Sequence, residues 1–292
     1  RLQHVGLALQ AGRIDLADLD IAPGQLRTQG KLQAVNTAEL LALAGITLPR
    51  VRNTLVLSGD WALDAGAQVN GRLHLQRDSG DIALQLAAPP PQVGSVTVAP
   101  QCTATLGGSR LRGGFLPLDT GQLVFDLTAK DSRLRAQAVL QTAIGTAQAS
   151  GELALSQRDG VWGVAGDAPL VLDAGADMPS LAWAAPLIGF DYRAEGRLQL
   201  AVQGRGTVAD PQFSGTLTGG ALRLAWAAQG VDLKDGTLRA HFSGDRLQLD
   251  QLEFHGGSGL LTATGSARLQ NGLPRATLDL RATRLQALNR PD

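Results

Sequence analysis

The chain has 292 residues, of which 36 are glycine and only 4% are aromatic, and its 26 basic side chains balance its 26 acidic ones. This composition favours many short strands and tight turns over a core of large rings. The absence of net charge argues against a nucleic-acid partner. The chain has no signal peptide and no apolar run that could cross a bilayer, so we expect an internal piece of a longer protein.

The first clear element is a strand around residues 14–21, in which aspartates alternate with isoleucine and leucine. Asp15, Asp18 and Asp20 could suggest a calcium loop. The segment lacks the turn glycine and the closing glutamate that such a loop needs. We therefore interpret the three carboxylates as the solvated face of a strand.

Residues 36–45 depart from the strand pattern. Asn36 is a suitable N-cap, Glu39 stands at the third helical position, and an apolar run is followed by glycine. This predicts a short helix over 36–45, which we expect to cover an open end of the sheet. Residues 180–189 predict a second short helix, truncated by Pro186.

Alternation of apolar and polar residues with a period of two dominates the rest of the chain. Examples are Leu73/Leu75, Leu123/Phe125/Leu127, Leu153/Leu155, Leu198/Leu200/Val202 and Leu278/Leu280. A Gly-x-Leu motif opens strands at irregular spacing, at Gly30, Gly71, Gly121, Gly151, Gly196 and Gly236. The motif predicts stacked hairpins in a quasi-one-dimensional sheet. The alternative is chance, because Gly-x-Leu is common in any β protein rich in these residues.

Pro89–Pro91 is the clearest break in the chain. We predict three regions, 1–88, 89–179 and 180–292, each a run of strands that contributes to the same architecture.

Two hairpins can be predicted with their register. Gly244-Asp245 is a two-residue turn signal that would pair Phe242 with Leu247 and Ala240 with Leu249. Asn271-Gly272 is a second signal of this kind and would pair Ala267 with Ala276. In both hairpins the apolar faces of the two arms coincide, as a correct register requires.

Side chains capable of chemistry are dispersed along the chain. The four histidines fall in separate strands, with His74 and His241 on polar phases, so no metal-ligand spacing arises. Cys102 has no evident histidine partner. Residues 204–209 match the loose dinucleotide fingerprint, but a new strand follows where a phosphate site needs a helix. We therefore expect no enzyme activity, no catalytic or metal-binding residue and no cofactor.

One stretch carries a more specific signal. Residues 206–217 read Gly-Thr-Val-Ala-Asp-Pro-Gln-Phe-Ser-Gly-Thr-Leu, which resembles the segment "GTLADPxLxGxL" typical of TamB-like proteins. The likeness continues at 231–238, 244–247 and 256–260. It covers residues 180–292, whereas the remainder shares only the strand rhythm and the short helix. These motifs are mainly turn chemistry, so they indicate architecture more than activity.

This resemblance implies a protein of the Gram-negative periplasm, tethered to the inner membrane by a segment outside the chain. The family is similar to AsmA-like and bridge-like lipid transfer proteins, so the implied activity is phospholipid transport, with acyl chains held on an apolar concave surface. The implied outer-membrane partner is TamA, an Omp85-type barrel, bound through a region beyond this chain.

Alternation alone favours a closed sandwich or barrel, in which apolar faces bury each other. The resemblance reverses that preference. It predicts an all-β fold, namely an elongated, curved antiparallel sheet of stacked hairpins that forms an open groove (a β-taco), with one or two short helices. Ten apolar residues are predicted to line the groove: Leu198, Leu200, Val202, Leu222, Leu224, Trp226, Leu238, Phe242, Leu247 and Leu249. For each of them the alternative is core packing alone.

Two other functions stay open. One is a scaffold for assembling outer-membrane proteins or autotransporters, in which exposed sheet edges pair with incoming strands. The other is an extracellular adhesin or β-helix. Such proteins usually carry asparagine-rich turns, and this chain has only five asparagines. A membrane barrel is disfavoured by the lack of aromatic girdles.

Overall fold

The fold is taken from a computed structural model. The structure describes residues 1–9, 11–43, 45, 51–85, 105–106, 109–110, 115–158, 161–185, 192–226, 230–270 and 273–285. The predicted break at Pro89–Pro91 and Cys102 lie outside these residues.

Fifteen strands form one antiparallel main sheet, in which each strand pairs with the next along the chain. They are β1 (Leu2–Leu9), β2 (Gly12–Ala22), β3 (Gln25–Asn36), β5 (Val56–Ala65), β6 (Val69–Ser79), β11 (Gln122–Lys130), β12 (Arg133–Thr142), β13 (Gly145–Ala154), β16 (Leu170–Met178), β17 (Tyr192–Gly206), β18 (Pro211–Trp226), β19 (Val231–Ser243), β20 (Arg246–Gly256), β21 (Gly259–Gln270) and β22 (Leu273–Thr283).

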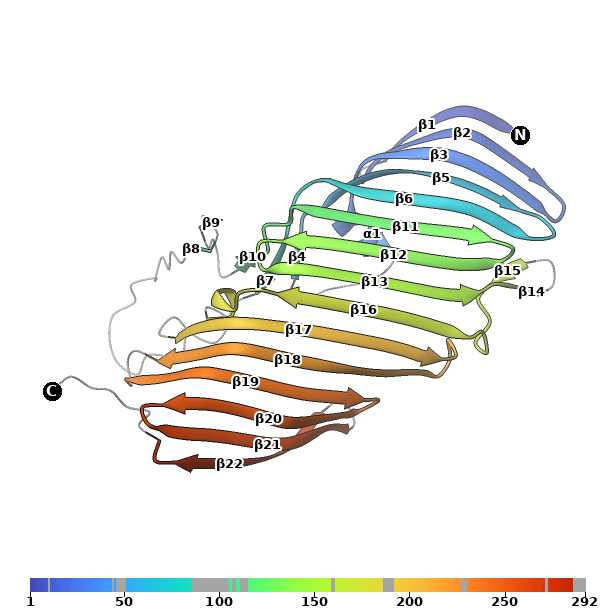
Figure 1. The fold of residues 1–292 in the computed structure, drawn as a ribbon. Coiled ribbons are helices and arrows are strands. Elements are labelled where there is room, and N and C mark those ends of the chain that lie inside the picture. Colours follow the sequence, from blue (N-terminus) through green and yellow to red (C-terminus); the bar gives the residue numbers. More distant parts are fainter. Residues whose placement is uncertain are drawn as a thin grey trace.

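The main sheet is not closed, because β1 and β22 stand at its two ends and each pairs with one neighbour only (Figure 1). The prediction of an all-β, curved and open antiparallel sheet is therefore confirmed. The three predicted regions contribute consecutive strands to it, since β6 pairs with β11 and β16 pairs with β17.

Both hairpin registers predicted from turn residues are confirmed. Phe242 lies opposite Leu247 and Ala240 opposite Leu249 across the β19–β20 hairpin. In the β21–β22 hairpin, Ala267 lies opposite Ala276. The short loops fix these registers, because a two-residue connection leaves the strands no freedom to slip. The prediction that the Gly-x-Leu motif opens strands holds at Gly121, which immediately precedes β11, and is wrong at the other five positions, because Gly30, Gly71, Gly151, Gly196 and Gly236 lie inside strands.

Bulges interrupt several ladders of the main sheet. The pairing of β18 with β19 shifts between Gly219 and Leu222, where Ala221 has a φ of 51°. A second shift follows in the pairing of β19 with β20, beside Asp235 at a φ of 51°. A bulge places an extra residue in one strand, which bends the sheet and increases its twist.

The remaining elements are short. β4 (Val51–Asn53), β7 (Ile82–Gln85) and β10 (Phe115–Pro117) form a three-stranded sheet, β8 (Thr105–Leu106) pairs with β9 (Ser109–Arg110), and β14 (Ser156–Arg158) pairs with β15 (Val161–Gly163). The helices are α1 (Thr37–Leu43) and the single 3-10 turn η1 (Ala182–Ala184). In the view of Figure 1, α1, β4 and β7 lie behind the main sheet.

The first predicted helix is confirmed as α1. The amide of Ala38 donates to Asn36 Oδ1 at 2.9 Å, so Asn36 satisfies one of the free amides of the first turn. Thr37 Oγ1 accepts a hydrogen bond from Asn53 Nδ2 at 2.8 Å, which ties the helix to β4. Of the second predicted helix, the described residues show only η1, and residues 186–190 lie outside them.

Full burial is rare in this fold. Among the described side chains Leu116 of β10 is the large one that is completely buried. A separate apolar cluster of Leu222, Leu233 and Phe254 lies on β18, β19 and β20. The fold therefore has small local cores along an extended sheet, rather than one central core.

Candidate functional site

A continuous apolar row crosses all fifteen strands of the main sheet on one face. Directly opposed residues of neighbouring strands point to the same face, so each register pair extends the row by one strand. We call it the central apolar row: Leu7, Ile14, Leu32, Gly59, Leu75, Phe125, Ala138, Ala149, Ala174, Val202, Gly215, Phe242, Leu247, Ala267 and Ala276. At about 4.8 Å per strand, the row is about 67 Å long.

The central apolar row is not covered as a sandwich interior would be. None of its residues is buried, and most are half-buried. Leu7 is 49% exposed at one end and Leu247 is 44% exposed towards the other. Partial cover of this kind is expected on the inner face of a curved open sheet, whereas two packed sheets would bury the same residues.

All ten residues predicted to line the groove lie on this face. Leu200 is opposite Leu217 and Val202 is opposite Gly215, which in turn faces Phe242. The remaining members join through equivalent pairs: Leu198 with Gly219 and Leu238, Leu222 with Gly236, Leu224 with Leu233, Trp226 with Val231, and Leu247 and Leu249 with β19. The prediction missed Leu217, which the Leu200 register would have revealed.

The ten differ in how much free surface they offer. Leu222 is only 6% exposed and belongs to the local core cluster. Leu198, Leu224 and Leu238 pack against that cluster, as do Leu181 and Leu285 from outside the strands. Trp226 stacks on Tyr192 with ring centroids 5.1 Å apart. Leu200, Val202, Phe242, Leu247 and Leu249 do not pack against that cluster, and none of them is buried.

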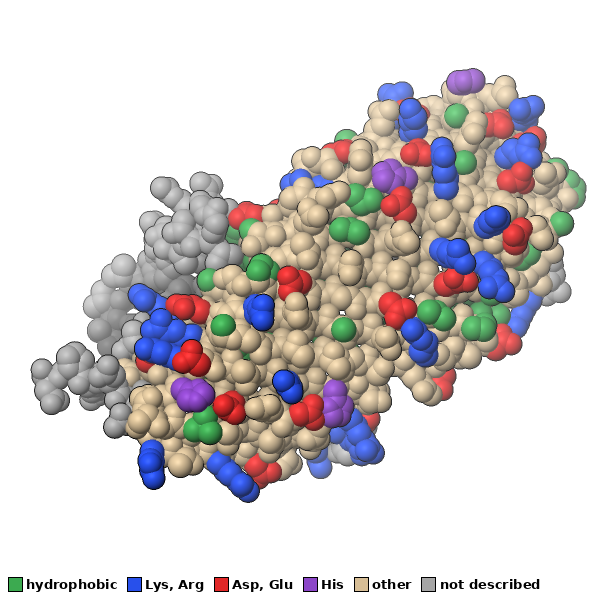
Figure 2. All heavy atoms as spheres, in the orientation of Figure 1, with side chains coloured by type: hydrophobic (Ala, Val, Ile, Leu, Met, Phe, Trp, Pro, Cys, Tyr) green, Lys and Arg blue, Asp and Glu red, His purple; other side chains and the backbone are tan. Residues whose placement is uncertain are grey.

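The opposite face carries polar side chains in an equally regular row. We call it the adjoining polar row: Asp15, Lys31, Asp60, His74, Asp126, Gln137, Ser150, Asp173, Gln203, Ser214, Ser243, Arg246, Arg268 and Arg275. Figure 2 shows this face, with basic and acidic side chains mixed over the sheet. The predicted polar placement of His74 and His241 is confirmed, because each bonds an aspartate there, at 2.6 Å and 2.8 Å.

Opposite charges across neighbouring strands hold the polar face together. Arg27 lies opposite Asp64 and bonds it at 2.7 Å. Arg223 donates to Asp232 through Nε at 2.8 Å and through Nη2 at 3.0 Å. This paired hydrogen bond lowers the pKa of Asp232 below its ordinary value of 3.8, although partial burial acts the other way. The same contact raises the pKa of Arg223.

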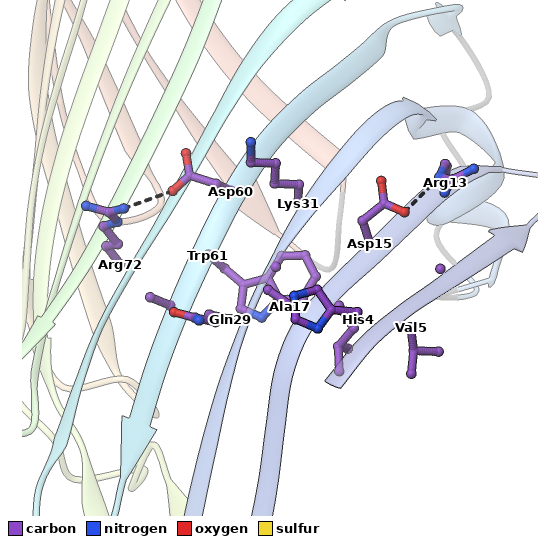
Figure 3. A pocket seen from close by; sticks show the side chains of 14 residues that line it. His4, Val5, Arg13, Asp15, Ala17, Gln29, Lys31, Asp60, Trp61 and Arg72 are labelled. Atoms are coloured by element: carbon purple, nitrogen blue, oxygen red, sulfur yellow. Dashed lines mark hydrogen bonds and ion pairs between the residues drawn. The ribbon is translucent and has the colours of Figure 1, made fainter. Parts of the chain in front are cut away.

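A hollow of about 590 Å³ lies over β1, β2, β3, β5 and β6 (Figure 3). Four of its charged side chains form two ion pairs, since Arg13 bonds Asp15 at 2.7 Å and Arg72 lies 3.4 Å from Asp60, and Lys31 adds one further positive charge. Trp61 of its lining donates through Nε1 to Thr28 at 3.3 Å. These groups are largely satisfied within the sheet, so this hollow is a weaker candidate than the apolar face.

Other chemistry finds no support among the described residues. They hold no group of three histidine, cysteine, aspartate or glutamate side chains placed to bind a metal ion. Asp15 and Asp18 instead contact Arg13 and Arg1. The described helices include none that is long and apolar enough to cross a membrane.

The geometry defines a β protein whose main sheet is open and has one apolar and one polar face. Comparison with protein-family models, with curated proteins and with solved structures finds no match. The resemblance to TamB-like proteins therefore stays a prediction from the motifs of residues 180–292.

Proposed function

We propose that the chain is a TamB-like component of the periplasm that shields lipid acyl chains in its apolar groove during phospholipid transport between the inner and outer membranes. The observation that carries the proposal is the central apolar row, which crosses fifteen strands without a polar side chain and remains only half-covered. On this proposal, a TamA-like outer-membrane barrel would be contacted through sequence beyond this chain.

The energetics favour such a surface. Each methylene left in water costs about 0.8 kcal/mol, so exposing two chains of roughly 16 carbons costs about 25 kcal/mol. A surface of leucine, alanine and glycine replaces water along the whole path. Because the row presents no polar contact, it creates no deep well at which a lipid would stop.

Native mass spectrometry with lipid extraction tests the proposal. The double variant L200D/L249D places two carboxylates on the open part of the groove, and we expect it to lose the co-purifying phospholipid that the unchanged chain retains. The matched control T216D/T218D adds the same charge to the polar face, at two exposed positions of β18, and should retain the lipid. If the aspartate variant does not fold, L200Q/L249Q replaces it. A lipid-free unchanged chain contradicts the proposal.

The assembly scaffold is a second candidate, favoured by the free edges of β1 and β22. An edge strand offers unpaired amides and carbonyls to an incoming strand. The two functions separate in one measurement. A strand peptide from an outer-membrane protein that binds equally well to the unchanged chain and to L200D/L249D would indicate the edge, and not the groove, as the working surface.

A further inference from the structure

Three basic residues stand in a row across the polar face at the end of the sheet. Several other basic residues of this face lie opposite an acidic one, as Arg135 faces Glu152 and Arg223 faces Glu195, and a single basic pair, Lys130 with Arg133, lies at the β11–β12 turn among the described residues. In the last three strands, Arg246 lies opposite Arg268, which lies opposite Arg275. Directly opposed like charges destabilise a sheet. The chain thus accepts a local cost where a neutral residue would serve the fold better.

These arginines line a hollow of about 870 Å³ at the turn ends of β20, β21 and β22. The described lining contains no carboxylate, and it adds the hydroxyl groups of Ser243, Ser266 and Thr277. Two acidic side chains reach the lining from outside, because Asp245 lies 3.4 Å from Arg268 Nε and Asp250 lies 2.8 Å from His241 Nδ1. The hollow therefore retains an excess of positive charge surrounded by neutral donors.

We propose that this hollow binds the phosphate of a phospholipid head group. A guanidinium donates two parallel hydrogen bonds to a phosphate, and three guanidinium groups on adjacent strands can surround its several acceptor oxygens. A carboxylate would occupy fewer of these donors. Bound phosphate would also remove the repulsion along the arginine row.

The position of the hollow selects a lipid over a free anion, and this step rests on the proposed function. Its lining includes Leu247, Ala267 and Ala276, which belong to the central apolar row and neighbour the three arginines along their strands. Leu247 is 44% exposed. The arginines face the polar side and these apolar neighbours the other side, close to the end of the sheet that β22 forms, so a lipid with its acyl chains on the apolar face reaches the hollow with its head group around that edge.

The test follows the arginine Nε–H signals of the full 292-residue chain by NMR. The probe is dihexanoyl phosphatidylglycerol below its micelle concentration, with inorganic phosphate as the comparison. We expect the lipid to shift the Arg246 and Arg275 signals and to bind more tightly than inorganic phosphate. The variant R246Q/R275Q should weaken binding at least about tenfold. The control R239Q/R281Q removes the same charge outside the hollow and should bind as the unchanged chain does.

Three results would overturn the assignment. They are an absence of NMR shifts on addition of the lipid, an equal loss of lipid affinity in R246Q/R275Q and R239Q/R281Q, and an affinity for inorganic phosphate equal to that for the lipid. The last of these results would indicate a site for free anions. Lipid retention by R246Q/R275Q, measured by native mass spectrometry, separates this failure from failure of the groove. If the variant keeps its lipid while the NMR result is negative, the head-group site alone is wrong.

Discussion

The ring of Phe242 lies against the backbone of Gly215 on the neighbouring strand. A Cβ atom built on Gly215 would lie 2.5 Å from Phe242 Cε1 and 2.2 Å from the carbonyl oxygen of Ala201. Trp61 and Gly30 form a similar pair, with a distance of 2.4 Å from such a Cβ to Trp61 Cη2. The rings of Phe242 and Trp61 therefore occupy the space that a side chain on the opposing strand would fill, which accounts for glycine at positions 215 and 30.

The first prediction concerns this pairing. Gly215→Ala should lower the free energy of unfolding by about 1–3 kcal/mol, because the added methyl forces either the ring or the backbone to move. Urea unfolding followed by circular dichroism measures the change. Gly163→Ala is the control, since nothing lies within 4 Å of its added Cβ. Equal stabilities for the two variants would contradict the packing described.

A second prediction separates packing from free groove surface. Leu222→Ala should cost about 2–5 kcal/mol, because Leu222 is 6% exposed and packs in the local cluster. Leu200→Ala should cost less than half as much, since Leu200 is only half-buried. Denaturant unfolding of both variants gives the comparison. If Leu200→Ala were the more destabilising change, Leu200 would be a core residue and the groove would be closed there.

The third prediction concerns acid stability. The pKa of Asp232 is lowered in the folded chain, chiefly by its hydrogen bonds from Arg223. The stabilisation is therefore fully present above the ordinary value of 3.8 and is lost as the pH falls through the lowered value. Asp232→Asn should reduce stability at neutral pH and flatten the acid limb of the stability curve. Asp279→Asn, at an exposed position of β22, should leave both unchanged.

Turn chemistry and alternation predicted the strands and the hairpin registers, whereas the open form of the sheet came from the resemblance, because alternation alone favoured a closed sandwich or barrel. Gly244-Asp245 fixed the pairing of Phe242 with Leu247, since a two-residue loop allows one register. The sequence analysis did not predict the bulges, although one of them has a recognisable signature in the sequence. In β18 the apolar residues have odd residue numbers up to Leu217 and even residue numbers from Leu222 onward. The change falls at Ala221, where the pairing with β19 shifts. A phase change of this kind within one strand is the signal of an extra residue.

The sequence allowed the residues of the candidate site to be assigned to one face of the sheet, but it did not show how exposed each of them is. Alternation places Leu200 and Leu222 on the same side of the sheet, and it contains nothing that reports how far each is covered. Cover depends on bends and on distant segments, such as Leu181 packing onto the cluster of Leu222. The register predicted from the Asn271-Gly272 turn already placed Arg268 opposite Arg275, whereas the position of Arg246 beside Arg268 depends on the pairing of β20 with β21, which was not predicted.

The most direct test of the groove is photo-crosslinking along β17. A photoreactive amino acid is placed, one position at a time, at residues 199 to 203 of the chain, which is then purified with bound lipid. The account predicts crosslinks to phospholipid from positions 200 and 202, whose side chains share the apolar face, and none from 199, 201 and 203. Crosslinks from both faces alike, or from neither, would contradict the proposal that the apolar face of this open sheet holds acyl chains.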